Sequence, residues 1–141
     1  MEQKDSKNIL IIIADFYDDI SSNLKNGAIN YLDKIKYSYE IKFVPGTLEI
    51  PIILSSFKKK YDGFIVLSCL IKGETDHYDV VKNIALSEIY KIAYANNLIM
   101  GSGIITANNY EQALSRSKIS KENYGGRAAV ACHKLLSLIN E

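Results

Sequence analysis

Apolar runs of strand length alternate with amphipathic segments along this chain of 141 residues. The runs cover Ile9–Ala14, Tyr39–Val44, Phe64–Ile71 and Leu98–Thr106. Apolar side chains recur at helical spacing in Asp18–Ile35, Thr47–Tyr61, His77–Asn97, Tyr110–Ser117 and Gly126–Leu138. Because strand–helix alternation favours parallel strands covered on both faces, the pattern predicts a three-layer, doubly wound α/β sheet of four parallel strands with helices on both faces. A single domain over residues 1–141 is expected.

Proline and glycine positions refine this pattern. Pro51 falls in the first turn of the second predicted helix, where a missing N–H costs little. Gly101 and Gly103 lie inside the fourth predicted strand. Glycine at such a place indicates either the close approach of another backbone or a ligand, or a local bulge. The sequence leaves both alternatives open.

Composition and charge exclude several classes of protein. With 17 basic and 16 acidic side chains, the chain has no basic field that would bind nucleic acid. The polar amino terminus lacks the pattern of a signal peptide and no stretch has the length of a membrane helix, so a cytoplasmic protein without membrane contact is expected. Cys69 and Cys132 have no metal-ligand spacing and are expected to be reduced, buried thiols. Since the sequence contains no Walker loop, zinc pattern, Ser-His-Asp order or dinucleotide fingerprint, neither a metal nor a cofactor is expected.

Polar and aromatic residues follow each predicted strand at its carboxyl end, the edge where open α/β sheets bind ligands. Phe16 could stack on a planar ring, although an aromatic residue there is often a helix staple. Glu49 could accept hydrogen bonds from a polyol or simply favour the helix dipole. The backbone N–H groups of Gly73–Thr75 suit a phosphate, and the alternative is an ordinary helix cap by Thr75 or Asp76.

Two charged or titratable side chains complete the set of candidates. His77 stands at the same predicted edge, where an imidazole could transfer protons near neutral pH. His133 lies within the last predicted helix and is interpreted as a packed residue. Arg116 could hold a phosphate with its planar fork or could simply be a solvated surface residue.

Five ordered motifs together resemble the lumazine synthase family. They are Phe16 after the first strand, Pro45-Gly46-Thr47-Leu48-Glu49-Ile50-Pro51, Gly73-Glu74-Thr75-Asp76-His77-Tyr78, Gly103-Ile104-Ile105-Thr106 with Glu111-Gln112-Ala113 and Arg116, and Asn123-Tyr124-Gly125-Gly126-Arg127-Ala128-Ala129. The similarity spans almost the whole chain in order, so chance is a poor explanation. It implies a flavodoxin-like fold and a cofactor-independent transferase of riboflavin biosynthesis.

The resemblance also implies the reaction. It joins 5-amino-6-ribitylaminouracil to 3,4-dihydroxy-2-butanone 4-phosphate, giving 6,7-dimethyl-8-ribityllumazine, phosphate and water. His77 would shuttle protons, and Glu74 and Thr75, through their N–H groups and the Thr hydroxyl, would face the butanone phosphate together with Arg116. The residues expected to hold the pyrimidine and its ribityl chain are Phe16, Thr47, Leu48, Glu49 and the backbone of Cys69, Leu70 and Ile71.

Departures from the family pattern affect the site and the assembly. Ser102 stands where the family often has an aromatic residue contributed to a neighbouring subunit, and Tyr17 stands where a small polar residue is common. Ser120 stands where the family often has a lysine that approaches the phosphate, and the sequence leaves open whether the next residue, Lys121, substitutes for it. The resemblance implies a ring of five subunits, alone or as twelve rings in a sixty-subunit shell, and possible contact with riboflavin synthase. The short amino-terminal arm and the altered loop at 117–124 favour the isolated pentamer.

Three other classes share parts of this pattern. A response-regulator receiver would need an Asp at the end of the third strand, where the chain has Cys69-Leu70-Ile71-Lys72. A flavodoxin-like FMN carrier would need a hydroxyl-rich phosphate loop after the first strand, where acidic residues 15, 18 and 19 would repel phosphate. A non-catalytic protein that binds riboflavin or lumazine on the same fold stays open, although His77 and Arg116 argue against it.

Overall fold

Four parallel strands form the centre of the molecule. The structure, a computed structural model, describes residues 6–74 and 76–140. The strands are β1 (Asn8–Ala14), β2 (Ser38–Val44), β3 (Gly63–Ile71) and β4 (Met100–Ala107), and they lie in the order β2-β1-β3-β4. Residues of β1 and β3 are almost all fully buried, which is why their sequences are continuously apolar.

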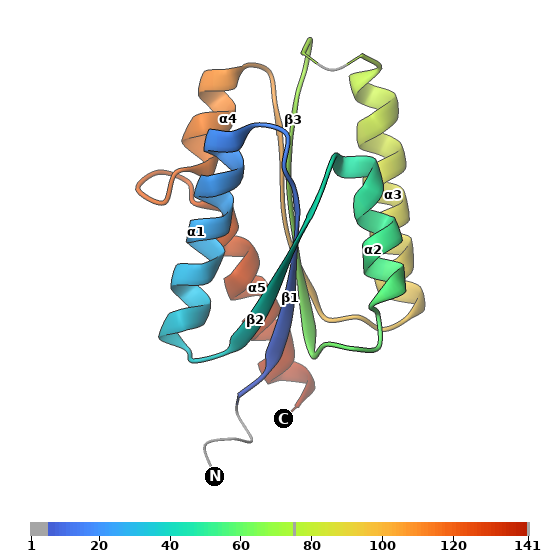
Figure 1. Cartoon of the computed structure of the whole chain (residues 1–141), viewed down its shortest axis with the longest axis vertical. Coiled ribbons are helices and arrows are strands. Elements are labelled where there is room, and N and C mark those ends of the chain that lie inside the picture. Colours follow the sequence, from blue (N-terminus) through green and yellow to red (C-terminus); the bar gives the residue numbers. More distant parts are fainter. Residues whose placement is uncertain (1–5, 75, 141) are drawn as a thin grey trace.

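Helices cover both faces of this sheet and produce three layers (Figure 1). One face carries α1 (Asp18–Lys34), α4 (Tyr110–Ser117) and α5 (Tyr124–Ile139), and the other carries α2 (Ile50–Ser56) and α3 (Tyr78–Ala95). A separate hydrophobic cluster fills each interface, with odd-numbered residues of β3 on the α1 and α5 side and even-numbered ones on the other. The predicted fold class, a doubly wound α/β sheet with helices on both faces, is thus confirmed.

The second predicted helix differs from the structure in its extent. A short 3₁₀ turn (Thr47–Glu49) leads into α2, which ends at Ser56 rather than Tyr61. Phe57 and Tyr61 continue the apolar spacing, but they pack from a turn, with the Tyr61 ring 6.0 Å from that of Phe64. Their hydrophobicity therefore reflects contact with β3 rather than a further helical turn. Pro51 does lie in the first turn of α2, as the sequence predicted.

Close backbone approach explains the glycines of β4. A Cβ atom at Gly101 would lie 1.9 Å from the carbonyl oxygen of Ala128 in α5. At Gly103 it would lie 2.8 Å from Leu67 Cδ2 and 3.0 Å from the carbonyl oxygen of Tyr124. Of the two alternatives left open by the sequence, the structure selects the approach of another backbone, because α5 crosses β4 without room for side chains.

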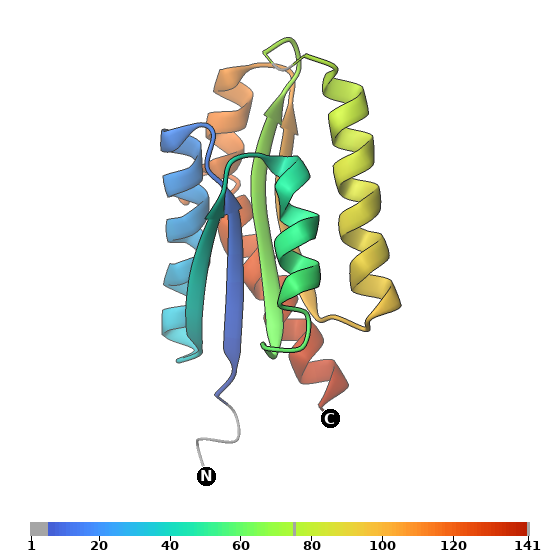
Figure 2. The same ribbon diagram turned by 45° about the vertical axis from the view of Figure 1, so that its right-hand side comes forward.

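The residue pairing of the sheet brings all four carboxyl ends to one edge, the upper one in Figure 1 and, after a partial turn of the molecule, in Figure 2. From β1 the chain adds β2 on one side, and β3 and β4 on the other. The gap between the ends of β1 and β3 is therefore a topological switch point, where open α/β sheets bind ligands. Within the described residues, no helix is both long and apolar enough to cross a membrane.

Candidate active site

A cavity of about 270 Å³ opens at the switch point between β1 and β3. Its walls come from the end of β1, the loop after β2, the end of β3 and the first turn of α3. The lining residues are Ala14, Phe16, Pro45, Gly46, Thr47, Leu48, Glu49, Ser68, Cys69, Leu70 and Val81. Every residue predicted to hold the pyrimidine and ribityl chain is among them except Ile71, which is fully buried in the core.

Phe16 is an exposed aromatic at the mouth of this cavity. Its side chain is 65% exposed although it follows directly after a strand of the core. The ring of Tyr17 packs edge-on against it, with centroids 4.9 Å apart and planes at 88°. Tyr17, which departs from the family pattern, therefore supports Phe16 from behind and leaves one face of its ring open to a planar ligand.

The end of β3 offers backbone groups as well as side chains. Phe64 N–H donates to Ile99 O and Lys72 N–H donates to Ala107 O, both at 2.8 Å, so even-numbered residues of β3 point their backbone groups toward β4. By alternation, Cys69 and Ile71 direct theirs to the β1 side, beyond the last β1–β3 pair at Leu67. Cys69 lines the cavity and Ile71 does not, so the backbone role implied for these two residues stays a prediction. Leu70 directs its backbone to β4 and therefore lines the cavity with its side chain.

His77 is exposed at the start of α3 in a left-handed backbone conformation, with φ 57° and ψ 42°. Such a conformation is uncommon for a residue other than glycine and costs about 1 kcal/mol. The N-cap position of α3 is occupied by His77, and not by Thr75 or Asp76 as the sequence alternative had it. The His77 side chain makes no capping hydrogen bond. Strained residues concentrate at functional sites, and this one lies in the loop that follows the carboxyl end of β3.

The loop before His77 differs from its expected arrangement in one respect. The Glu74 N–H donates to Ile71 O at 3.2 Å, so in this structure it closes a turn rather than facing a phosphate. The Glu74 side chain is exposed, and the positive φ of 88° at Gly73 lets the chain turn back toward α3. Thr75, the other residue expected at the phosphate, lies outside the described residues.

Arg116 reaches the same edge of the sheet from α4. Its Nη1 donates to the carbonyl oxygen of Thr106 near the end of β4 at 2.6 Å, which anchors the half-buried guanidinium. A guanidinium has five N–H donors, so an anchored one can still bind an anion. Ser102 lies further back on β4, half-buried on the edge strand. Lys121 and Ser120 are exposed in the loop between α4 and α5.

Comparison with known proteins agrees with this geometry. The profile of the 6,7-dimethyl-8-ribityllumazine synthase family matches residues 6–140. A protein of that name from Bartonella henselae is 38% identical over 135 residues, which cover 93% of this chain and 87% of the relative. Its counterpart from Paramagnetospirillum magneticum is 37% identical over 142 residues, covering 94% and 95%. The Rhizobium meliloti protein named 6,7-dimethyl-8-ribityllumazine synthase 1 is 37% identical over 138 residues, covering 93% and 90%.

The chain belongs to the lumazine synthase family. It is therefore an enzyme of the transferase class, as the motifs predicted. The comparisons confirm the family named from the five motifs, and the alternative of a non-catalytic protein that binds riboflavin or lumazine is not favoured.

The cavity is also lined by three residues that the sequence pattern did not indicate as site residues, namely Ser68, Ala14 and Val81. Ala14 and Val81 carry no chemical signal that could have identified them. Ser68 does carry one, because it is a hydroxyl residue within the otherwise apolar sequence Phe64–Ile71, and it is 1% exposed. Its hydroxyl lies 2.6 Å from that of Thr47 across the cavity wall.

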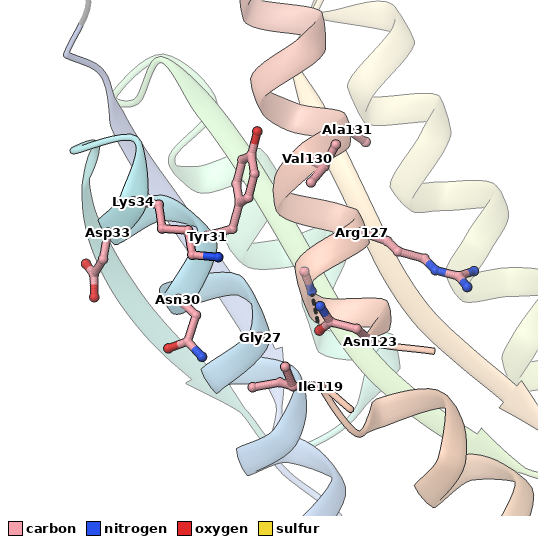
Figure 3. A pocket seen from close by; sticks show the side chains of 11 residues that line it. Gly27, Asn30, Tyr31, Asp33, Lys34, Ile119, Asn123, Arg127, Val130 and Ala131 are labelled. Atoms are coloured by element: carbon pink, nitrogen blue, oxygen red, sulfur yellow. Dashed lines mark hydrogen bonds between the residues drawn. The ribbon is translucent and has the colours of Figure 1, made fainter. Parts of the chain in front are cut away.

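A larger cavity, about 650 Å³, lies between α1 and α5 and includes none of the predicted site residues (Figure 3). Tyr31, Lys34 and Asn30 of α1 face Val130 and Ala131 of α5 across it. This cavity lies in the helical layer on one face of the sheet. It is not at the carboxyl ends of the strands, where folds of this class bind ligands. Volume alone therefore does not identify the functional site of this chain.

Both cysteines of this chain, Cys69 and Cys132, are free and buried. Burial raises the pKa of the Cys69 thiol to about 12, and the Glu74 carboxylate adds to this shift. Burial likewise raises the pKa of Cys132 to about 12, and backbone hydrogen bonds with Phe64 and Gly101 oppose the shift. Since a thiol attacks only as the thiolate, neither cysteine is a nucleophile near neutral pH. Across residues 6–74 and 76–140, no cluster of three or more acidic, His or Cys side chains is arranged to hold a metal ion.

Proposed function

We propose that this chain condenses 5-amino-6-ribitylaminouracil with 3,4-dihydroxy-2-butanone 4-phosphate to give 6,7-dimethyl-8-ribityllumazine, phosphate and water. The observation that carries the proposal is the cavity at the β1–β3 switch point, since it brings together Phe16, the loop of residues 45–49 and the end of β3, where the family resemblance implies the pyrimidine substrate. The relatives named above bear the name of this product. A cytoplasmic location belongs to the same proposal.

The cavity suits the pyrimidine substrate. Phe16 offers the open face of its ring for stacking, and the backbone at Cys69 and Ile71 supplies hydrogen-bonding groups for the edge of the heterocycle. Leu48 and Glu49 line the opposite wall, where the Glu49 carboxylate can accept hydrogen bonds from ribityl hydroxyls. These groups fix the plane and the direction of the nucleophilic amine.

The butanone phosphate is assigned to the edge formed by the loop before α3 and by Arg116. The N-terminus of α3 favours an anion, and Arg116 provides a planar fork for the phosphate oxygens. His77, exposed beside this loop, would move protons as the amine condenses with the ketone and phosphate departs. Since the amine is already nucleophilic and phosphate is a competent leaving group, much of the acceleration comes from holding both substrates in reacting geometry.

The direct test is to incubate the purified protein with both substrates and to follow lumazine fluorescence and phosphate release. Stoichiometric appearance of both products is expected. Binding of the pyrimidine without any product would contradict the proposed reaction and favour a protein that only binds such ligands.

Replacing His77 with alanine is expected to lower kcat by about 10- to 100-fold without abolishing turnover, because positioning of the substrates persists. Steady-state kinetics with both substrates varied would measure this. His133→Ala is the matched control, because His133 bonds to Tyr31 OH through Nδ1 at 2.7 Å, away from the cavity. Equal kcat in the wild type and in His77→Ala would remove His77 from the mechanism.

A ring of five subunits is part of the proposal. The outer face of α3 carries exposed apolar side chains, with Val80 54%, Ile84 49% and Tyr94 76% exposed, and Ile52 of α2 is 63% exposed beside them. Several large apolar side chains exposed on neighbouring helices favour a protein–protein interface on this face. In such a ring a neighbour would contribute Ser102 to the site, and the assembled ring would be the form that contacts riboflavin synthase.

Light scattering of the purified protein is expected to give the mass of five chains of 15.8 kDa each, about 79 kDa. The isolated ring is favoured over a shell of twelve rings because of the altered loop at 117–124. A species near one megadalton would contradict the isolated ring, and a monomer would contradict the ring itself.

A further inference from the structure

Ser68 is an unexpected residue in the most buried strand of the sheet. All nine residues of β3 are buried, and its sequence Gly-Phe-Ile-Val-Leu-Ser-Cys-Leu-Ile contains a single hydroxyl side chain. A buried hydroxyl is costly unless it is hydrogen-bonded, so its presence needs a partner and a reason. At 1% exposed, Ser68 has no access to solvent that could satisfy it.

Its partner lies in a different segment of the chain. The hydroxyl of Ser68 is 2.6 Å from that of Thr47, which is 5% exposed and begins the 3₁₀ turn after β2. One of the two hydroxyls donates and the other accepts, and 21 residues separate them in sequence. The bond thus joins the loop after β2 to the end of β3.

This bond lies in the wall of the site cavity. Thr47 and Ser68 both line it, and they are flanked by Leu48 and Glu49 on one side and by Cys69 and Leu70 on the other. The local bond from Glu49 N–H to Gly46 O shapes the turn but does not connect it to the sheet. The hydroxyl pair does connect it, and so sets how far Glu49 stands from the edge of β3.

We propose that Ser68 is a positioning residue for the pyrimidine substrate: through Thr47 it holds the loop of residues 45–49 at the spacing from β3 that the heterocycle and ribityl chain require. The inference rests on the proposed function, since it concerns the same cavity. Ser68 acts through Thr47 and is not itself assigned a contact with substrate. The phosphate edge, formed by the start of α3 and Arg116, lies outside the reach of this bond.

The test measures binding of 5-amino-6-ribitylaminouracil alone by calorimetry, and steady-state KM for each substrate, in the wild type and in Ser68→Ala. Loss of one buried hydrogen bond leads us to expect about tenfold weaker pyrimidine binding and a similar rise in its KM. The KM for the butanone phosphate should stay within about twofold, since a general loss of structure would raise both. Ser117→Ala is the control, because Ser117 is also buried but its hydroxyl bonds to Leu114 O within α4 and to Asn23 of α1, on the opposite face of the sheet from the cavity.

A double variant separates positioning from mere stability. If Ser68 acts through Thr47, adding Thr47→Val to Ser68→Ala should weaken pyrimidine binding by much less than the product of the two single effects. Multiplicative effects, or unchanged pyrimidine binding in Ser68→Ala, would overturn the inference. Calorimetry needs no turnover, so a wild type that binds the pyrimidine but forms no lumazine would defeat the proposed reaction while the binding comparison still decides the role of Ser68.

Discussion

Gly101→Ala should destabilise the fold by about 3 kcal/mol or more, although alanine adds only a methyl group. The added Cβ would lie 1.9 Å from Ala128 O and 2.8 Å from Ala128 C, both backbone atoms of α5. A backbone carbonyl in the middle of a helix cannot rotate away, so β4 and α5 would have to separate. Because α5 also packs against α1, the separation would disturb the whole layer on that face.

Gly103→Ala is the matched comparison for this prediction. It lies on the same strand and the same face, but its nearest obstacle is Leu67 Cδ2 at 2.8 Å, the far end of a flexible side chain. A cost of about 1 to 2 kcal/mol is expected there. Urea unfolding at one fixed protein concentration would compare the two, since oligomerisation makes stability depend on concentration. Equal stabilities, or a stabilised Gly101→Ala, would contradict the packing described for α5.

Arg116→Ala is expected to lower kcat/KM for the butanone phosphate by about 30- to 100-fold, mainly through a higher KM. The guanidinium is held near the end of β4 by its bond to Thr106 O, so its fork is oriented before substrate arrives. Removing it would take away both the charge and the paired donors. Arg116→Lys should recover only part of the loss, because an ammonium group restores the charge without the fork.

The chain offers a control with the same change in charge, because Arg127 is its second and last arginine. Arg127 belongs to α5, and its guanidinium carbon lies 5.4 Å from the centroid of the Tyr124 ring in the same helix. Arg127→Ala should leave the KM for the butanone phosphate unchanged. Steady-state kinetics on both variants would show this, and a similar loss in both would mean that net charge rather than the fork at Arg116 attracts the phosphate.

The local pattern of apolar and polar residues was sufficient to predict most of the helices and strands. Continuous burial of β1 and β3 appears in the sequence as unbroken apolar runs, and α3 shows the helical spacing that places Ala85, Ile89 and Ala93 inward. The end of α2 was not predictable in this way. Phe57 and Tyr61 have the spacing of a helix, but the ring of Tyr61 packs on Phe64 of β3 and the ring of Phe57 packs on Tyr61, and such contacts across a turn leave no periodic signal.

The sequence by itself determined the strand–helix order, the family motifs and the candidate residues at the strand ends, because periodicity and short motifs are local properties. Only the tertiary structure decided that β1 lies between β2 and β3, which places Phe16, Thr47 and Cys69 around one cavity. It alone showed that Ser68 meets Thr47 and that α5 requires Gly101. Strand neighbours and contacts between distant segments depend on how the layers pack as a whole, and no short stretch of sequence contains that information.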